Sequence, residues 1–242
     1  MRRRAVEEAG FSGFLHHIIK FKERLRRGIA PGRLAPFIGG GSMMRTIQYM
    51  ILGYLSGSVL YARVVAGLLG KRGIYAGSKD QNPGTANAFT YGGFLCGLGT
   101  LLGDLFKGAV PVWLFLRKGS AAPSLALSLV IAAPVFGHAF PVFFRFQGGK
   151  GIAVTFGCLI GLFPQWRPLI LFIGAFLLFS LVIRVTPHFQ RTVFSYLLTL
   201  VCLFLTRQGV GIRLGFLLIT AIVCLRMHMS KEPREDMLVR LF

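Results

Sequence analysis

The stretch RFQGGKGIAVTFG, residues 145–157, combines the residue types that bind phosphate. Gly148, Gly149 and Gly151 let backbone N–H groups approach an anion without an intervening Cβ. Lys150 can neutralise a phosphate charge, and a helix that begins directly after the loop would point its positive end at the same place. The loop is not of the Walker A type, because Gly151 stands where GxxxxGK[ST] requires serine or threonine. The stretch therefore predicts a phosphate cradle of another kind.

A second polar stretch, GSKDQNPGTANAF, spans residues 77–89. Its turn-forming and hydrogen-bonding residues include Asn82, Gly84, Thr85 and Asn87. Such a turn exposes amides and hydroxyls and can form an anion-binding nest. An ordinary loop is the simpler interpretation, because asparagine, proline and glycine are turn residues. Taken alone, the stretch leaves both interpretations open.

Three ionisable residues lie within or at the end of apolar segments. Asp104 and Lys107 are three positions apart in LLGDLFKG, so that both charges share one helix face. Charges inside a membrane are unfavourable, so they mark either a functional site or a pair that neutralises itself. The three-residue spacing of Asp104 and Lys107 is compatible with both interpretations. His138 can titrate near neutral pH and act as a base, although a histidine at a helix end is more often a hydrogen-bonded structural residue.

The composition is that of a membrane protein. Of the 242 residues, 54% are hydrophobic and only 15% are charged, against about a quarter in soluble domains. The formal charge of +20 indicates anionic lipid headgroups or anionic substrates as partners. Nucleic acid is disfavoured, because the basic residues stand at the ends of apolar runs. The four cysteines lie in apolar stretches without a CxxC pattern, and we interpret them as small hydrophobes rather than metal ligands or disulfides.

Seven apolar segments have the length or composition of spanning helices. They are residues 46–70, 92–116, 122–144, 151–165, 168–185, 191–206 and 211–226. The fourth is short, which predicts a re-entrant or tilted segment. The glycines within several of them favour close helix packing. We therefore expect an all-α polytopic membrane protein with about seven transmembrane helices in one bundle.

The basic residues predict the orientation. Eleven lysines and arginines fall on the side reached after the first helix and five on the other, so the first side should be cytoplasmic. The ten basic residues up to Arg45 would reverse this balance, to fifteen against eleven. We therefore hypothesise that translation begins at Met43 or Met44, which makes residues 1–43 a basic extension of a membrane domain at 44–242. The alternative is a basic amphipathic tail on a membrane surface.

The polar stretches fall on this same side, which predicts an anion site at the cytoplasmic face. An enzyme acting on phosphorylated, partly lipidic substrates and a transporter of organic phosphates both have such sites. Transporters place theirs near the midplane between internal repeats, whereas these motifs are at loop level and the two halves show no repeat. The sequence therefore favours an enzyme.

At these residues the chain, over 44–242, resembles the acyl-phosphate:glycerol-3-phosphate acyltransferase family (PlsY) of polytopic bacterial enzymes. The motifs that carry the resemblance are GYLSGSVLYARVV, NPGTAN, DLFKG and GHAFPVFFRFQGGKGIAVTFG. The last is the most specific, because it is close to the family's second motif along its whole length.

The resemblance implies that an acyl group passes from acyl phosphate to the C1 hydroxyl of glycerol 3-phosphate, giving lysophosphatidic acid and phosphate for phospholipid synthesis. It implies no cofactor, no coenzyme A thioester and no acyl-enzyme. It implies a multi-pass protein of the bacterial inner (plasma) membrane with its active-site loops in the cytoplasm. The partners are then acyl phosphate, glycerol 3-phosphate and membrane lipids.

The residues and the resemblance together give a candidate site without a metal. Its candidate catalytic residues are His138, Asp104, Lys107 and His228, the last from the resemblance alone. Its candidate substrate-binding residues are Asn82, Gly84, Thr85, Asn87, Gly148, Gly149, Lys150 and Gly151. The stretch at residues 77–89, which comes first in the chain, is called the first polar loop from here on. By resemblance, this loop binds the phosphate of acyl phosphate and Lys150 helps to hold glycerol 3-phosphate.

Four positions depart from the family pattern. Asp80 and Gln81 stand in place of a serine and a glycine. Thr90 stands in place of an arginine used for glycerol phosphate, and Lys231 in place of a C-terminal asparagine. These departures leave an alternative open, in which a degenerate family member binds or moves an anionic lipid precursor without acyl transfer.

Overall fold

The computed structural model describes residues 40–71, 78, 82–117, 124–230 and 236–241. All of them belong to one compact unit, Phe37–Phe242. The predicted N-terminal extension, residues 1–43, lies outside the described residues except for its last four positions. The departures Asp80, Gln81 and Lys231 lie outside them as well.

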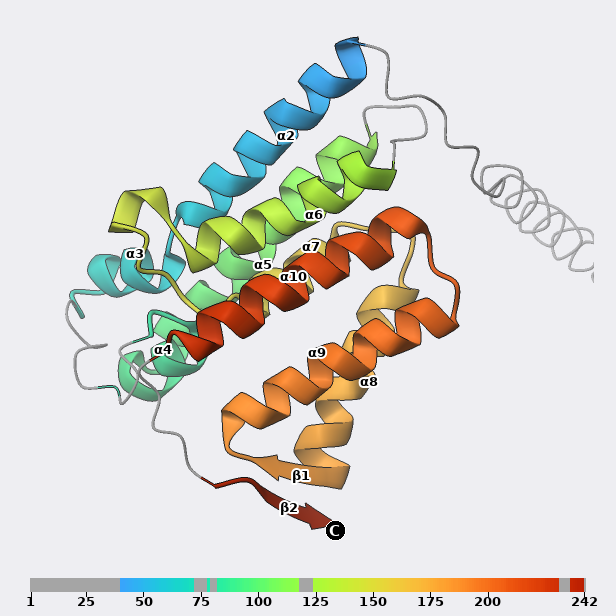
Figure 1. Ribbon diagram of the computed structural model, residues 1–242. Coiled ribbons are helices and arrows are strands. Elements are labelled where there is room, and N and C mark those ends of the chain that lie inside the picture. The colour runs from blue at the N-terminus through green and yellow to red at the C-terminus, as the bar shows by residue number, and fades with distance from the viewer. Residues whose placement is uncertain (1–39, 72–77, 79–81, 118–123, 231–235, 242) are drawn as a thin grey trace, which may run out of the picture. The chain divides into compact units, whose positions relative to one another are not determined.

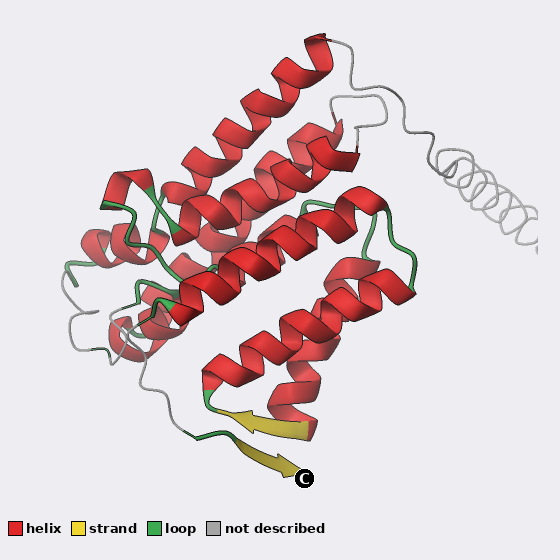
Figure 2. Ribbon diagram, viewed as in Figure 1, coloured by secondary structure: helices red, strands yellow, loops and turns green. Residues whose placement is uncertain are grey.

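The described residues form a helical bundle with one small sheet (Figures 1 and 2). The helices are α2 (Gly40–Ser58), α3 (Tyr61–Leu68), α4 (Thr85–Gly92), α5 (Phe94–Arg117), α6 (Ser124–Ala139), η2 (Val142–Phe144), α7 (Ile152–Ile160), α8 (Arg167–Leu177), the π-helical turn η3 (Leu178–Val182), α9 (His188–Leu205) and α10 (Val210–His228). The strands β1 (Ile183–Thr186) and β2 (Leu238–Leu241) pair antiparallel, with Ile183 opposite Leu241.

Four described helical segments are long and apolar enough to cross a membrane: Phe94–Arg117, Ser124–Phe144, His188–Leu205 and Val210–His228. A fifth is added if α2 and α3, bent by 44° at their junction, form one broken span. The nine residues of α7 give about 14 Å of helix, well short of the bilayer core. The prediction of an all-α polytopic membrane protein is confirmed, and the count of seven spans is not.

Two predicted helices differ from the observed ones. The segment 46–70 is broken after Ser58, where α2 ends. The segment 168–185 leaves helical geometry in η3 and ends as strand β1, directly before Pro187. A residue before proline is biased towards extended backbone, and the β-branched residues of β1 favour a strand, so the hydrophobic run overestimated this helix.

Glycines let the helices approach closely. A Cβ added to Gly57 of α2 would overlap the carbonyl of Pro134 in α6, and one added to Gly137 of α6 would overlap the carbonyl of Tyr54 in α2. The same kind of contact joins α7 to α5 at Gly157. Small residues at helix crossings are typical of membrane bundles, where backbone contact replaces the hydrophobic effect between helices.

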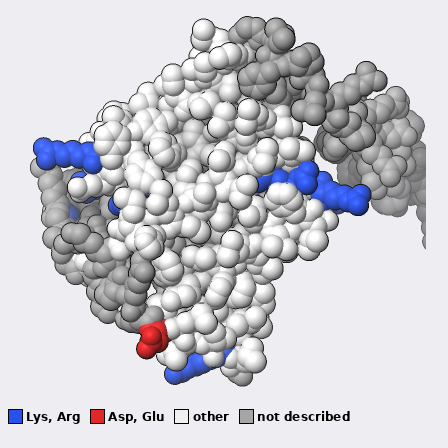
Figure 3. Space-filling model, viewed as in Figure 1, with Lys and Arg blue, Asp and Glu red and all other residues white. Residues whose placement is uncertain are grey.

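The main hydrophobic core lies between α5, α6, α7, α8, α9 and α10. Phe172, Tyr196 and Phe216 are fully buried there and pack ring against ring at centroid distances of 4.8 to 5.7 Å. Many leucine and phenylalanine side chains are instead exposed on the outer faces of the helices. Most of the described surface in Figure 3 carries no charge. A surface of this kind suits contact with lipid rather than with water.

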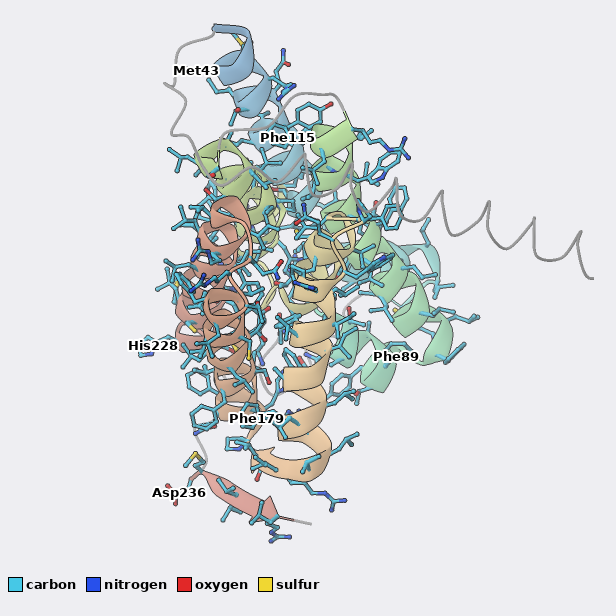
Figure 4. All side chains as sticks on the ribbon, turned by 90° about the vertical axis from the view of Figure 1, so that its right-hand side faces the viewer. Met43, Phe89, Phe115, Phe179, His228 and Asp236 are labelled. Carbon is cyan, nitrogen blue, oxygen red and sulfur yellow. The ribbon has the colours of Figure 1, made fainter. Side chains whose placement is uncertain are left out.

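One end of the bundle gathers the polar stretches that the sequence analysis singled out. α4 and the end of α6 with the loop after it lie towards the left in Figure 1, and α9 begins below them, next to β1. Met43 and Phe115 lie together towards the opposite end, as Figure 4 shows. The helices thus bring segments that are far apart in the chain to a single end.

Candidate active site

The buried charges form a cluster around Lys107 of α5. Its ammonium group lies 2.8 Å from Asp104 Oδ1, 2.8 Å from His138 Nδ1 and 2.7 Å from Val59 O. The Val59 carbonyl lies at the junction of α2 and α3, so the helix break supplies the third acceptor. Lys107, Asp104 and His138 are each at most 2% exposed. An ammonium group has three N–H donors, and this environment places two hydrogen-bond acceptors and one counter-ion around it.

The Lys107 contact determines which nitrogen of His138 carries the proton. An ammonium group donates and cannot accept, so Nδ1 of the imidazole is the acceptor and the proton lies on Nε2. A Cβ added to Gly149 would overlap that Nε2 atom. The donor edge of His138 therefore faces the glycine-rich loop, and Lys107 stands behind the ring.

The glycine-rich loop, residues 148–151, is held from two sides. The backbone N–H of Gly149 donates to the carbonyl of His138 at 3.0 Å. The guanidinium group of Arg226, on α10, donates to the carbonyl of Gly148 at 2.5 Å. Gly151 has a φ of +83°, which favours glycine, and α7 begins directly after it. The prediction of a helix that starts near Ile152 is confirmed.

The first polar loop meets the glycine-rich loop at Asn82. Its carbonyl accepts from the Asn87 amide at 2.9 Å and from the Gly84 N–H at 2.8 Å. A Cβ added to Gly149 would lie 3.2 Å from Asn82 Oδ1, so the two loops are in contact. Thr85 Oγ1 donates to Asp104 Oδ2 at 3.4 Å and connects the same loop to the buried cluster. The first polar loop, the glycine-rich loop and the buried cluster around Lys107 therefore converge.

A pocket of about 650 Å³ opens where they converge. Eight of the twelve predicted site residues line it: Asn82, Gly84, Thr85, Asn87, Asp104, His138, Lys150 and Gly151. Lys150 is 7% exposed, and it is the one lysine or arginine among the described lining residues. Leu101, Ile152 and Phe156 form apolar parts of the wall. The pocket can therefore hold a ligand with an anionic head and an apolar tail.

The other four predicted residues lie away from the described wall of the pocket. Gly148 and Gly149 belong to the loop but not to the lining, and Lys107 lies behind His138. His228 is exposed at the end of α10, and Figure 4 shows its side chain projecting from the bundle. Its catalytic role stays a prediction based on the resemblance.

The structure adds two residues that the sequence analysis did not select. Arg226 supports the glycine-rich loop. Its sequence position did not indicate this role, because a basic residue in the last turn of an apolar helix is also a common membrane anchor. His188, the first residue of α9, lines the pocket together with Pro187. Thr90, one of the departures from the family pattern, also lines it.

The described lining residues supply amides, hydroxyls, a lysine and an imidazole N–H, and they include neither serine nor cysteine. Such groups bind anions and stabilise developing negative charge, which accelerates transfer between bound substrates without a covalent intermediate on serine or cysteine. Fold and site together define a polytopic membrane protein with an amphipathic pocket at one end of its bundle.

The chain belongs to the glycerol-3-phosphate acyltransferase family, whose family model matches residues 47–234. Similar curated proteins are the glycerol-3-phosphate acyltransferases of Burkholderia multivorans and Burkholderia lata, which are 41% and 42% identical to it over 122 residues. These alignments cover 50% of this chain and 56% of each relative, so the chain spans about half the length of the curated relatives it matches.

The fold is similar to two crystal structures of PlsY (YgiH), an integral membrane glycerol 3-phosphate acyltransferase. The glycerol 3-phosphate form superposes with a TM-score of 0.65 at 23% identity, covering 76% of this chain and 88% of that one. The lysophosphatidic acid form has a TM-score of 0.62 at 24% identity, with 75% and 87% covered. The predicted resemblance to the PlsY family is confirmed.

Proposed function

We propose that this protein transfers an acyl group from acyl phosphate to the C1 hydroxyl of glycerol 3-phosphate, giving lysophosphatidic acid and inorganic phosphate. The observation that carries the proposal is the single pocket in which Lys150, the first polar loop and His138 meet an apolar wall. Both substrates have an anionic head, and one of them also has an acyl chain. The names of the curated relatives and the ligand forms of the related PlsY structures support glycerol 3-phosphate as the acceptor.

In this proposal the described residues have distinct roles. Lys150 and the backbone amides of its loop bind the phosphate of glycerol 3-phosphate, and the loop that contains Asn82 and Thr85 binds that of acyl phosphate. His138 donates from Nε2 to an oxygen that becomes more negative during transfer. Lys107 positions His138 and does not touch substrate, which its place outside the pocket lining and the three partners of its ammonium group support. Asp104 lines the pocket and holds Lys107 in place.

The chemistry requires one bond exchange. The C1 hydroxyl oxygen forms an ester bond with the acyl carbon, and the bond from that carbon to the phosphate oxygen breaks. Phosphate leaves with the electron pair and takes up the hydroxyl proton, so atoms and charge balance. A phosphate anion is a sufficient base for this step, and the protein contributes orientation and charge neutralisation.

We also propose that the protein lies in a bacterial plasma membrane with the pocket open to the cytoplasm. The count of eleven lysines and arginines that the sequence predicts on the side reached after the first helix, against five on the other, supports this orientation when residues up to Arg45 are left out. Glycerol 3-phosphate is water-soluble and can reach a pocket at that face, while the acyl chain stays in the bilayer.

A second candidate function is binding or movement of an anionic lipid precursor without turnover. It is favoured by Thr90, which lines the pocket at the position where the family resemblance places an arginine. The pocket then holds a lipid phosphate through Lys150 but lacks a cation for a second phosphate at that position.

One assay separates the two functions. The full-length protein in lipid nanodiscs is mixed with acyl phosphate, and phosphate release is followed with and without glycerol 3-phosphate. We expect release that depends on the acceptor and matches the lysophosphatidic acid formed. Binding of acyl phosphate without acceptor-dependent release would refute acyl transfer and support the second candidate. Release without the acceptor measures hydrolysis and serves as the baseline.

A further inference from the structure

Tyr196 of α9 is a buried tyrosine whose hydroxyl group reaches a neighbouring helix. Its ring is fully buried against Phe172 and Phe216, at centroid distances of 4.8 and 5.7 Å. Its Oη donates to Thr155 Oγ1 of α7 at 2.8 Å, across forty-one positions of the chain. Burying a hydroxyl group among aromatic rings is unfavourable unless it forms a hydrogen bond, so this contact ties α9 to α7 at a defined point.

Thr155 connects this contact to the glycine-rich loop. Because Tyr196 donates to its oxygen, the hydroxyl proton of Thr155 is directed elsewhere, and it is donated to the carbonyl of Gly151 at 3.0 Å. The backbone N–H of Thr155 donates to the same carbonyl at 2.9 Å. A carbonyl oxygen has two lone pairs, so the Gly151 carbonyl is held by two donors at once.

The two bonds matter because glycine restrains its own peptide group poorly. Gly151 has a φ of +83° and a ψ of 6°, and a residue without Cβ has few steric limits on the rotation of the peptide group that follows it. The bonds from Thr155 hold the Gly151 carbonyl towards α7. In a trans peptide group the N–H points opposite to the carbonyl, so the N–H of Ile152 is directed away from the helix.

The first turn of α7 presents such N–H groups to the pocket. In a helix that begins at Ile152, the N–H groups of Ile152, Ala153 and Val154 have no acceptor within the helix. Gly151, Ile152 and Ala153 line the pocket, as does Lys150. Helix N–H groups next to a lysine are suited to a phosphate. Their direction depends on the peptide group that the bonds to Gly151 hold.

We propose that Tyr196 is a positioning residue for the phosphate of glycerol 3-phosphate, acting through Thr155 and the carbonyl of Gly151. Neither Tyr196 nor Thr155 is among the described residues that line the pocket. Tyr196 keeps the first turn of α7 in the orientation in which its N–H groups meet the anion. The inference rests on the proposed function, which assigns this turn to glycerol 3-phosphate and the first polar loop to acyl phosphate, so it concerns one substrate and not the other.

Two substitutions remove the hydroxyl groups with little change in side-chain volume. In steady-state assays of the full-length protein, Tyr196→Phe should raise the KM for glycerol 3-phosphate about three- to tenfold, as for the loss of one ordinary hydrogen bond. Thr155→Val removes both bonds of its hydroxyl group and should raise this KM about tenfold or more. Thr155→Ser keeps the hydroxyl group and should stay within about twofold of the wild type. The KM for acyl phosphate should change less than about twofold in all three.

The chain offers a matched control for each substitution. Thr199 is fully buried like Thr155, and its hydroxyl group donates to the carbonyl four positions before it at 2.7 Å, but both groups lie within α9. Tyr49 packs against Phe115, which lies towards the opposite end of the bundle (Figure 4). Thr199→Val and Tyr49→Phe should leave the KM for glycerol 3-phosphate unchanged. Tyr196→Phe should add less than about twofold in a Thr155→Val background, because it acts through Thr155.

A purely structural role of Tyr196 predicts a different result. Tyr196→Phe would then lower the unfolding temperature and the fraction of active protein, and with it kcat, while both KM values stay unchanged. That result, an equal rise in both KM values, or a Thr199→Val variant that matches Thr155→Val would overturn the proposal. If Tyr196→Phe does not fold, Thr155→Val and Thr155→Ser decide, and equal KM values for glycerol 3-phosphate in these two variants would overturn it.

Direct binding separates this inference from the proposed function. Calorimetric titration of glycerol 3-phosphate into the detergent-solubilised protein should give binding that Tyr196→Phe and Thr155→Val weaken and Thr155→Ser preserves. If the wild type and its variants show this pattern without acyl transfer, the proposed function fails and the positioning role stands. If the wild type transfers acyl groups and all these variants bind and react normally, the positioning role fails and the function stands.

Discussion

Replacing Lys107 with methionine tests the buried cluster around His138. Methionine keeps a long flexible apolar side chain but removes the ammonium group. The change leaves Asp104 Oδ1, His138 Nδ1 and Val59 O without the donor that lies 2.7 to 2.8 Å from each of them. Asp104 and His138 are at most 2% exposed, so the surrounding protein offers little room for water to replace it.

Two mechanisms predict different magnitudes for this change. Three ordinary hydrogen bonds between membrane helices, at about 0.6 kcal/mol each, would together contribute about 2 kcal/mol. A carboxylate left buried without its counter-ion destabilises a protein by about 3–5 kcal/mol. The other hydrogen bond to the Asp104 carboxylate, from Thr85 Oγ1, is long at 3.4 Å. We therefore expect Lys107→Met to lower the free energy of unfolding by about 3–5 kcal/mol, the value for an unpaired buried carboxylate.

Reversible unfolding in mixed micelles measures this free energy for the wild type, for Lys107→Met and for the double variant Asp104→Asn/Lys107→Met. The double variant removes the unpaired charge, so it should recover at least about half of the lost stability. It should still have a kcat lowered about tenfold or more, because nothing then fixes the His138 proton on Nε2. A loss below about 2 kcal/mol, or no recovery in the double variant, would refute the ion-pair reasoning.

Substitutions at three further positions test the glycine-rich loop. Lys150→Ala should lower kcat/KM about ten- to a hundredfold through loss of a charge-assisted phosphate contact, and an unchanged rate would mean that Lys150 is only a membrane-end anchor. Arg226→Ala should raise the KM for glycerol 3-phosphate about tenfold by freeing the Gly148 carbonyl, with Arg226→Lys intermediate. Gly149→Ala should displace His138, because the added Cβ would overlap its Nε2 atom. It should lower the free energy of unfolding by about 1–3 kcal/mol, measured by thermal unfolding, and it should also lower kcat, measured by turnover.

Part of the fold could be predicted from the sequence, because the signals are local. Long apolar segments with glycines predicted a helical membrane bundle, and Gly151 followed by an apolar run predicted the start of α7. The prediction was wrong where tertiary contacts or proline changed the outcome. The helix at 46–70 breaks beside Val59, whose carbonyl bonds to Lys107 forty-eight positions away. The helix at 168–185 ends early because Pro187 favours extended backbone before it.

The sequence by itself determined which residues carry the polar chemistry, since charges and amides next to apolar segments are conspicuous at any position. Only the tertiary structure decided how they cooperate. Arg226 reaches Gly148 across seventy-eight positions, and His188 enters the pocket because α9 is anchored to α7. The chain distance between such partners carries no local signal. Helix packing alone brings them within hydrogen-bonding distance. In the case of His138, the contact with Lys107 on Nδ1 leaves Nε2 facing the glycine-rich loop.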